Sequence, residues 1–398
     1  MNLLVITDKL FPDETGGSCT YSYQTSLCFH KLGHKVDIFT GYPDKKENDK
    51  YFKGIHIYRH LNKKSIWYSA KMLKRVIDTN EYDAVLFHSV ISWFIYSLIR
   101  RRLSKTPQEV AIFHGPWSKE AKLKYISQKH YHKLMLIPFI RLIEYRYSKG
   151  INKFVVLSNY MREQLELIGD GGESRKYVVI PGGVNLSEFN RLYSKDEARR
   201  KLHIANDEIV FFSMRRLDIR MGIQNAIAAL NRINLGERRI TYIIGGKGSY
   251  ENELRRKAQD LVKARCIFAG FIPEEEINEY FCAADLFLVP SIDLEGFGLV
   301  ILESLAMGLP VLVTPQGGMK ELEDKLEGFY LTDGFKPEDI SQKIQELFLE
   351  GKLDICYGEN LKEYDWSEIT KRIEVYISSI ISEVKYEKPI SIYNNIKL

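Results

Sequence analysis

The stretch VPSIDLEGFGLVILESLAMGLPV, residues 289–311, combines the end of a strand, a glycine-rich turn and a helix. The apolar run 285–289 that leads into it predicts a buried strand, and Gly296-Phe297-Gly298 predicts the entry to a helix. Gly308 and Pro310 end that helix. A strand followed by a short turn and a helix is the repeating unit of a parallel α/β sheet, so this stretch predicts that fold class.

The same alternation of apolar runs and helical periodicity continues along the chain and predicts two doubly wound domains. A turn-rich break, PGGVNL at 181–186, separates them, so we place the domains at 1–183 and 184–365. A helical pattern from 366 to about 383 follows. The predicted strands are 2–7, 35–40, 83–87, 110–113, 153–157 and 177–180 in the first domain and 209–213, 240–244, 266–269, 285–289 and 310–314 in the second.

The turn at 296–298 has the features of a phosphate-binding site. Ligands of open parallel sheets bind outside the carboxyl ends of the strands. Glycines let a ligand approach the backbone, and the free N–H groups of a first helical turn favour an anion. Glu295 and Glu303 flank this turn, and because carboxylates repel phosphate we expect them to accept hydrogen bonds from sugar and ribose hydroxyls. The spacing alone also fits two glutamates that share no ligand.

A cationic loop follows the first strand of the second domain. Residues 214–222 contain Arg215, Arg216 and Arg220, and arginine forks suit the oxygens of a diphosphate. The same cluster also fits a solvated surface loop. A further glycine loop, GGKG at 245–248, follows the next strand and is a weaker signal, because helix-capping loops often have this composition.

Length and composition narrow the class of protein. The chain has 398 residues and a formal charge of +5, too mild to indicate nucleic acid. No apolar run approaches the roughly 18 residues of a membrane span, and residues 1–7 show no signal peptide, so we expect a cytoplasmic protein. Reduced thiols are expected for the scattered cysteines, Cys19, Cys28, Cys266, Cys282 and Cys356.

Residues 119–149 form a basic segment. They contain eight Lys or Arg against Glu120 and Glu144, with aromatic residues between them. Such a helical stretch can lie on an anionic membrane surface, here the inner face of the plasma membrane. A solvated helical face has the same pattern.

Taken together, the motifs resemble the retaining nucleotide-sugar glycosyltransferases of family four over nearly the whole chain. The most specific part is the Glu-x7-Glu element of Glu295 and Glu303, with its Gly-Phe-Gly core and the downstream Gly-x-Pro-Val. The other motifs are FP…GG at 11–17, GHKV at 33–36, FHG at 113–115, VLS at 156–158, VIPGGV at 179–184, RL…G at 216–222, GGKG at 245–248 and GG…E at 317–321.

The resemblance implies a GT-B fold of two Rossmann-like domains, with a C-terminal helix at about 366–385 completing the first and the donor held mainly by the second. Glu295 would contact the hydroxyls of the donor sugar, Glu303 the ribose and Arg216 the diphosphate. His114 would orient the sugar through a hydrogen bond, unless it is a plain turn histidine. The other donor-binding residues implied are Gly16, Gly17, Gly246, Phe271, Ile272, Gly296, Phe297, Gly298, Leu299 and Val300.

One position departs from the family pattern. Met221 stands where Arg-x4-Lys-Gly has its lysine, and Arg220 is the expected replacement. Preplaced donors would stabilise the leaving diphosphate, and the chain has no Asp-x-Asp pair, so we expect neither metal nor cofactor. Retention needs either a carboxylate nucleophile with an acid partner or front-face substitution in which the leaving phosphate takes the acceptor's proton; the resemblance favours the second.

The expected function is transfer of a sugar from a UDP-sugar or GDP-mannose to a hydroxyl of a glycan, lipid-linked sugar or polyol, in bacterial surface polysaccharide biosynthesis. Two alternatives remain at this point. A catalytically silent glycosyltransferase-like subunit is motivated by Met221, and a nucleotide-sugar isomerase shares the two-domain architecture but needs no acceptor.

Overall fold

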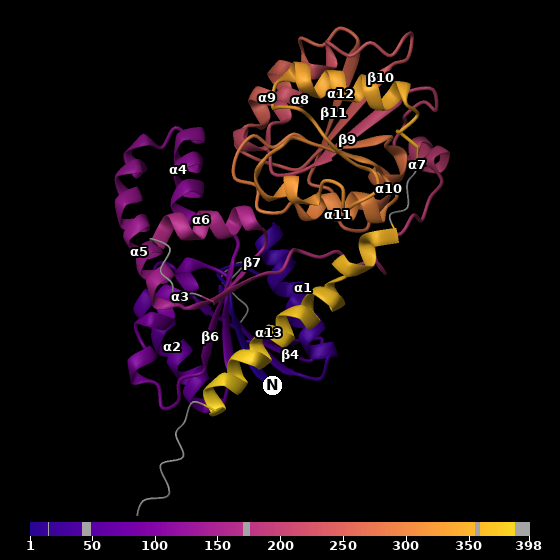
Figure 1. The fold of residues 1–398 in the computed structure, drawn as a ribbon. Helices are drawn as coiled ribbons and strands as arrows, with labels where there is room; N and C mark the ends of the chain where they lie inside the picture. Colours follow the sequence, from indigo (N-terminus) through magenta and orange to yellow (C-terminus); the bar gives the residue numbers. More distant parts are fainter. Residues whose placement is uncertain (15, 42–48, 170–175, 355–358, 387–398) are drawn as a thin grey trace, which may run out of the picture.

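The computed structural model describes residues 1–14, 16–41, 49–169, 176–354 and 359–386. The described chain forms two α/β domains, one above the other in Figure 1, each built on its own parallel sheet. The two parallel sheets predicted from the alternating pattern are confirmed. Cys356 lies outside the described residues, and the other four cysteines are free thiols.

The sheet of the first domain has the order β3-β4-β2-β1-β5-β6-β7-β8 and is parallel except for the β3–β4 pair. Its central strand β1 pairs with β2 and β5, and the side chains from Leu3 to Ile6 are fully buried because helices cover both faces. The strands are β1 (Asn2–Ile6), β2 (Lys35–Gly41), β3 (Lys50–Phe52), β4 (Ile55–Leu61), β5 (Ala84–Phe87), β6 (Gln108–Phe113), β7 (Lys153–Val156) and β8 (Lys176–Val179).

Helices cover both faces of this sheet. One face packs against α1 and α13, and the other packs against α2, α3, α5 and α6 (Figure 1). The helices of this part are α1 (Gly17–Lys31), α2 (Ile66–Thr79), α3 (Val90–Ser97), η1 (Arg100–Arg102), α4 (Trp117–Ser127), η2 (Tyr131–Leu136), α5 (Ile137–Gly150) and α6 (Asn159–Gly169).

The sheet of the second domain is parallel throughout, in the order β11-β10-β9-β12-β13-β14. Its strands are β9 (Ile209–Met214), β10 (Ile240–Gly245), β11 (Ala264–Gly270), β12 (Leu286–Val289), β13 (Val311–Val313) and β14 (Phe329–Leu331). Its helices are α7 (Lys195–Lys201), η3 (Ile219–Met221), α8 (Ile223–Leu230), α9 (Glu251–Ala258), α10 (Ile277–Ala283), α11 (Leu299–Ala306), η4 (Gly317–Leu322), α12 (Pro337–Leu349) and η5 (Glu359–Tyr364).

The chain crosses between the domains twice, and the two crossings are hydrogen-bonded to each other. The backbone N–H of Val184 donates to the carbonyl of Tyr364 at 2.9 Å, and the N–H of Trp366 donates to the carbonyl of Val184 at 3.1 Å. After the second crossing, α13 (Trp366–Tyr386) runs along the first domain beside α1 (Figure 1). The Tyr376 hydroxyl there donates to the Lys176 carbonyl at 2.9 Å.

The sequence pattern misses β3, β4 and β14. Along β4 the burial alternates strictly, with Ile55, Ile57, Arg59 and Leu61 buried, whereas the predicted strands were recognised as continuous apolar runs. A strand near a sheet edge keeps one face partly open and therefore has a period of two. β3 and β14 have three residues each, too few for a periodic signal.

Candidate active site at the domain interface

Loops from the carboxyl ends of both central strands meet at the domain interface. A Cβ atom placed on Gly16 would lie 3.7 Å from Nη2 of Arg216, and one on Gly17 would lie 3.8 Å from Cδ1 of Leu299. Gly16 and Gly17 begin α1 of the first domain, whereas Arg216 follows β9 and Leu299 begins α11 of the second. The fold therefore brings together residues of both domains that the family resemblance implied for donor binding.

Glu295 is held by a partner that the sequence analysis did not single out as a site residue. The Arg215 side chain donates from Nη1 to Ser291 Oγ at 2.7 Å and pairs through Nη2 with Glu295 Oε2. Ser291 Oγ donates to the same Oε2 at 3.2 Å. The side chains of Arg215 and Glu295 are only 6% and 13% exposed, so each charge depends on the other for compensation.

The pairing leaves the other oxygen of Glu295 available. Oε1 has no partner among the described residues and is not an enclosed atom. A carboxylate fixed through one oxygen can accept a ligand hydroxyl with the other. The adjacent arginines at 215 and 216 gave the only sequence signal for this arrangement, because neighbouring residues at a strand end point to opposite sides.

Arg216 and Arg220, both predicted to face phosphate, have different surroundings. The Arg216 side chain is 55% exposed, and its nearest acidic group is Asp218 at 3.9 Å. Arg220 instead donates from Nη1 to the Leu294 carbonyl at 2.9 Å, and its Nη2 lies 3.8 Å from Glu120 of the first domain. Arg216 is therefore the more accessible guanidinium for an anion, and the phosphate role of Arg220 stays a prediction.

Arg220 supports the loop that carries Glu295. Leu294 has φ of 46°, a left-handed conformation that a non-glycine residue adopts only at a cost. The hydrogen bond from Arg220 to the Leu294 carbonyl fixes this residue immediately before Glu295. Met221, in the position of the family lysine, is 6% exposed and packs into the core of the second domain with Leu217 and Ile223.

The glycine loop at 245–248 packs against the arginine loop backbone to backbone. Gly246 has φ of 119°, and a Cβ there would lie 1.8 Å from the Arg215 carbonyl oxygen. Its own N–H donates to the Gly270 carbonyl at 2.5 Å. The structure thus gives Gly246 a packing reason to be glycine, and its predicted contact with the donor stays a prediction.

The start of α11 is open to an anion. Gly298 precedes the helix with φ of 83°, and no side chain caps the helix. The N–H of Ile301 donates to the Gly298 carbonyl, whereas those of Leu299 and Val300 have no backbone partner in the described chain. These two groups therefore remain as donors for a ligand at the positive end of the helix dipole.

The residues before α11 also anchor the loop to the first domain. Ser158 Oγ donates to the Gly296 carbonyl at 2.9 Å. The Phe297 ring is 5% exposed and lies 6.3 Å from the ring of Tyr364, centre to centre. The side chain of Phe297 therefore fixes the loop, and its predicted donor contact would come from its backbone.

Glu303 is half-buried and has no partner among the described residues. Burial, with a smaller contribution from Glu274, raises the pKa of Glu303 to about 7. Leu299, which contacts the first domain at Gly17, is four residues before Glu303 on the same face of α11. Glu303 thus has free acceptor capacity on the helix face that meets the other domain.

His114 follows β6 and lies next to the Glu295 loop, because a Cβ on Gly296 would be 3.4 Å from the His114 carbonyl oxygen. Its Nε2 is 3.1 Å from Nδ1 of His88, a residue that the sequence analysis missed. Burial lowers the pKa of His114 to about 4, against a smaller opposing effect of Asp8. His114 is therefore neutral at physiological pH and is suited to hydrogen bonding.

Phe271 and Ile272, both implied donor-binding residues, differ in exposure. Phe271 is 55% exposed, whereas Ile272 is 5% exposed and packs against Gly245 at the end of β10. An exposed ring beside a strand end can stack on a base. Ile272 can reach a ligand only through its backbone.

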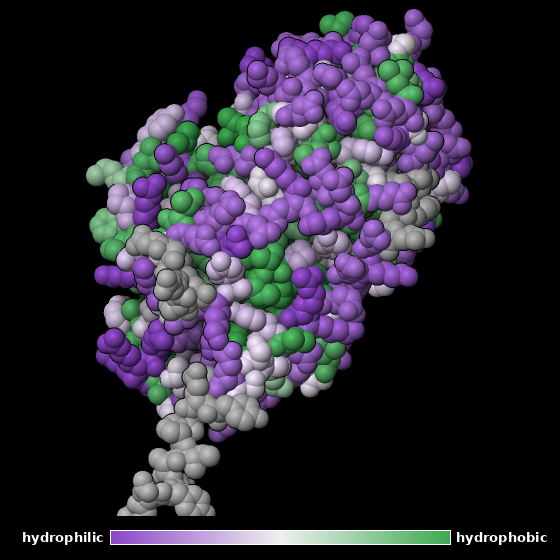
Figure 2. Space-filling model, viewed as in Figure 1, coloured by the Kyte–Doolittle hydropathy of each residue, from purple (hydrophilic) through white to green (hydrophobic). Residues whose placement is uncertain are grey.

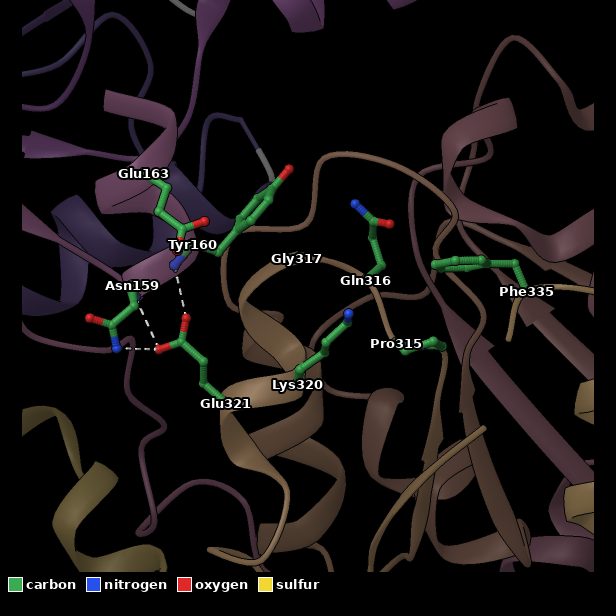
Figure 3. Close-up of a pocket in the computed structure, with 9 residues that line it drawn as sticks. All are labelled: Asn159, Tyr160, Glu163, Pro315, Gln316, Gly317, Lys320, Glu321 and Phe335. Carbon is green, nitrogen blue, oxygen red and sulfur yellow. Dashed lines mark hydrogen bonds between the residues drawn. The ribbon is translucent and has the colours of Figure 1, made fainter. Parts of the chain in front are cut away.

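A shallow hollow of about 520 Å³ lies between the start of α6 and residues 315–321 (Figure 3). In Figure 3 the Glu321 carboxylate accepts hydrogen bonds from the backbone N–H groups of Asn159 and Tyr160, at 3.0 and 2.9 Å, and so caps α6 across the interface. Gly318 N–H donates to the Glu295 carbonyl at 3.1 Å. None of the residues that line the hollow is a predicted site residue. Gly318, next to the hollow, holds the Glu295 loop through this hydrogen bond.

Neither a metal cluster nor a membrane-spanning helix is present among the described residues. They contain no cluster of three or more His, Cys, Asp or Glu side chains placed to hold a metal ion. Within the same part of the chain, no helix is both long and apolar enough to span a membrane.

Comparison with known proteins places both halves of the chain among sugar-transferring enzymes. Residues 194–364 match the model of glycosyl transferases group 1, and residues 15–188 match that of glycosyltransferase family 4. The alpha-monoglucosyldiacylglycerol synthase of Streptococcus pneumoniae is 25% identical over 401 residues, which cover 96% of this chain and 87% of that protein.

Solved structures share the architecture. The sucrose-phosphate synthase of Thermosynechococcus elongatus has a TM-score of 0.76 at 19% identity, covering 96% of this chain and 99% of its own. The Anabaena protein HepE, solved with UDP and glucose, has a TM-score of 0.73 at 17% identity, covering 95% and 100%.

Proposed function

Because the chain belongs to glycosyltransferase family 4 and has the GT-B fold, we propose that it transfers a sugar from a nucleoside diphosphate sugar to a hydroxyl of a glycan, lipid-linked sugar or polyol. The observation that carries the proposal is that three groups with free hydrogen-bonding capacity lie at the interface. They are the exposed guanidinium of Arg216, the uncapped start of α11 and the unpartnered carboxylate of Glu303. A diphosphate with a ribose on one side supplies partners for all three.

The donor would lie along α11. Arg216 and the N–H groups of Leu299 and Val300 would bind the diphosphate, Glu303 would accept from the ribose, and the free oxygen of Glu295 would accept from the sugar. HepE, which shares the fold, was solved with UDP and glucose, and this supports a nucleoside diphosphate sugar as the donor. UDP-sugars and GDP-mannose are both candidates.

In the proposed transfer, negative charge develops on the leaving diphosphate. As the anomeric C–O bond breaks, its electron pair stays on the diphosphate, where Arg216 and the start of α11 stabilise it. The acceptor oxygen bonds to the anomeric carbon from the same face, and its proton passes to the leaving phosphate oxygen. In this scheme the configuration is retained, and the protein's own cations replace a metal.

Donor binding tests the proposal. UDP- and GDP-sugars are screened for thermal stabilisation and slow donor hydrolysis, with and without EDTA, in the wild type, Glu295→Ala and Arg220→Ala. We expect one donor to stabilise the wild type in EDTA and to be hydrolysed, and Glu295→Ala to lose hydrolysis. If no donor stabilises the wild type, the proposal is wrong. An unchanged response of Arg220→Ala limits that residue to supporting the loop at Leu294.

We also propose that the first domain binds an anionic membrane surface, where surface polysaccharide acceptors are assembled. Exposed apolar side chains cover α4, η2 and α5, the left side of the molecule in Figure 2, among them Tyr131, Met135 and Phe139 at 60, 79 and 69% exposure. They stand beside the basic residues of 119–149, and apolar side chains with cations around them match an anionic lipid surface. The lipid named in the streptococcal relative supports this setting.

Vesicle flotation tests whether the protein binds an anionic membrane surface. We expect the protein to float with vesicles that contain phosphatidylglycerol and to remain at the bottom with phosphatidylcholine alone. Met135→Ser with Phe139→Ser removes apolar contact without changing charge, and we expect it to reduce flotation. Leu349→Ser, at an 83% exposed position of α12 in the second domain, is the matched control. Equal recovery with both lipids contradicts the proposal.

A further inference from the structure

A second histidine, His88, contacts His114. His88 follows β5, is 4% exposed, and places its Nδ1 3.1 Å from Nε2 of His114. The two rings stack with their centres 5.3 Å apart. The ring of Tyr21, itself buried, lies 6.0 Å from His88 and 5.3 Å from His114. The Tyr21 ring therefore packs against both histidines.

Both imidazoles are neutral in this environment. Burial lowers the pKa of His88 well below its usual value, and it lowers that of His114 to about 4. A neutral imidazole carries one hydrogen, so one nitrogen donates and the other accepts. The contact between the rings must therefore be a single N–H···N hydrogen bond, and its direction determines the tautomer of both histidines.

The unpartnered nitrogen of His88 indicates the direction. His88 Nε2 is buried and has no hydrogen-bond partner in the described part of the protein. If His114 donated, Nε2 of His88 would carry the hydrogen and would be a buried N–H without an acceptor. Orphaned buried N–H groups are rarer than under-satisfied acceptors, so the favoured arrangement has the hydrogen on Nδ1 of His88. In that arrangement His88 donates to Nε2 of His114.

The direction of this hydrogen bond also determines whether Nδ1 of His114 carries a hydrogen. With Nε2 as an acceptor, the hydrogen of His114 must be on Nδ1. This atom has no partner among the described residues, yet it is not an enclosed atom. We propose that His88 is a positioning residue that fixes His114 in the tautomer whose Nδ1–H donates to an oxygen of the bound sugar. The sugar contact rests on the proposed function, but the tautomer does not.

Two substitutions of nearly equal shape distinguish the two directions of the hydrogen bond, because one keeps a donor at residue 88 and the other places an acceptor there. The amide nitrogen of Asn in His88→Asn can occupy the place of Nδ1 and donate, whereas the carboxylate of His88→Asp can only accept when ionised. We expect His88→Asn to keep kcat within about 3-fold, whereas His88→Asp lowers kcat by about 100-fold, the scale for loss of one preplaced hydrogen-bond donor. The KM for the donor should change less than kcat, because Arg216 and Glu303 still bind the nucleotide.

Nitrogen-15 NMR of histidine-labelled protein tests the tautomer without any substrate. The signals of His114 are assigned among the nine histidines by their loss in His114→Gln. We expect Nδ1 of His114 to be the protonated nitrogen in the wild type and in His88→Asn, and Nε2 to be protonated in His88→Asp. If Nδ1 of His114 is unprotonated in the wild type, the inference is wrong, whether or not His88→Asp folds.

The activity data separate this inference from the proposed function. If the wild type transfers sugar but His88→Asn and His88→Asp lose the same fraction of kcat, His88 is only a packing residue and the inference is wrong. If no donor is used, the proposed function fails, and the tautomer measured by NMR still stands or falls by itself.

Discussion

The second domain lines the site with a buried ion pair, Arg215 and Glu295, whereas the first domain lines it with a neutral pair, His88 and His114. Both pairs are largely removed from water, but only the first keeps its charges, because each charge has an opposite partner. The histidines have no such partner, and burial keeps them uncharged. The difference shows that burial alone does not decide the charge of a group at this site, because an opposite charge beside it decides whether it stays ionised.

The largest effect is expected from breaking the ion pair. Arg215→Met leaves the largely buried Glu295 without an opposite charge, which should lower the free energy of unfolding by roughly 3 kcal/mol and activity by about 1,000-fold. Denaturant unfolding and donor hydrolysis measure the two effects. The double variant Arg215→Met with Glu295→Gln removes both charges, so we expect it to regain most of the stability but no activity. Loss of activity without loss of stability in Arg215→Met would contradict the burial argument.

A smaller effect is expected at the neighbouring exposed arginine. Arg216→Gln removes a cation from the surface beside Gly16, so kcat/KM should fall by about 10- to 100-fold, the range of a charged hydrogen bond, with the melting temperature unchanged. Steady-state kinetics with varied donor check this. Arg239→Gln, at a 66% exposed arginine on the other end of the sheet, is the control and should change neither quantity. A stability loss in Arg216→Gln equal to that of Arg215→Met would remove the contrast between the two positions.

The smallest effect concerns the protonation of Glu303. Its pKa is raised from 4.5 to about 7, so donor affinity should weaken as the pH falls from about 8 to 6, because the protonated carboxyl accepts hydrogen bonds less well. Glu303→Gln should bind about 10-fold more weakly at pH 8 and lose this pH dependence. Isothermal titration calorimetry with UDP or GDP measures both, and a wild-type affinity that is flat over this range contradicts the assignment.

The same pKa shift predicts the stability of the free protein. The folded state holds the Glu303 proton up to about pH 7 and the unfolded state only to about 4.5, so this group lowers stability as the pH rises through that window. Above pH 7 the full penalty remains. Glu303→Gln should therefore melt a few degrees higher than the wild type at pH 8 and at the same temperature at pH 4. Scanning calorimetry at both values checks the sign.

Much of the fold could be predicted because the signals were local. The strands that are buried on both faces are continuous apolar runs, such as Leu286–Val289, and the glycines at 296–298 mark the start of α11. The edge strands β3 and β14 were missed because they are short, and β4, next to β3, was missed because it is only half-buried. Their burial depends on what covers them, which a single sequence window does not contain.

The sequence by itself determined that two parallel-sheet domains form, that Arg216 and Glu295 lie in loops after strands, and that Glu303 lies in the helix after the glycine turn. These properties depend on residues close together in the chain. Only the tertiary structure decided that Arg215 pairs with Glu295 and His88 with His114, 80 and 26 residues apart. The spacing of a sequence does not encode which side chain covers another. Partner choice and burial, and with them the charge of each group, follow from how the two domains pack.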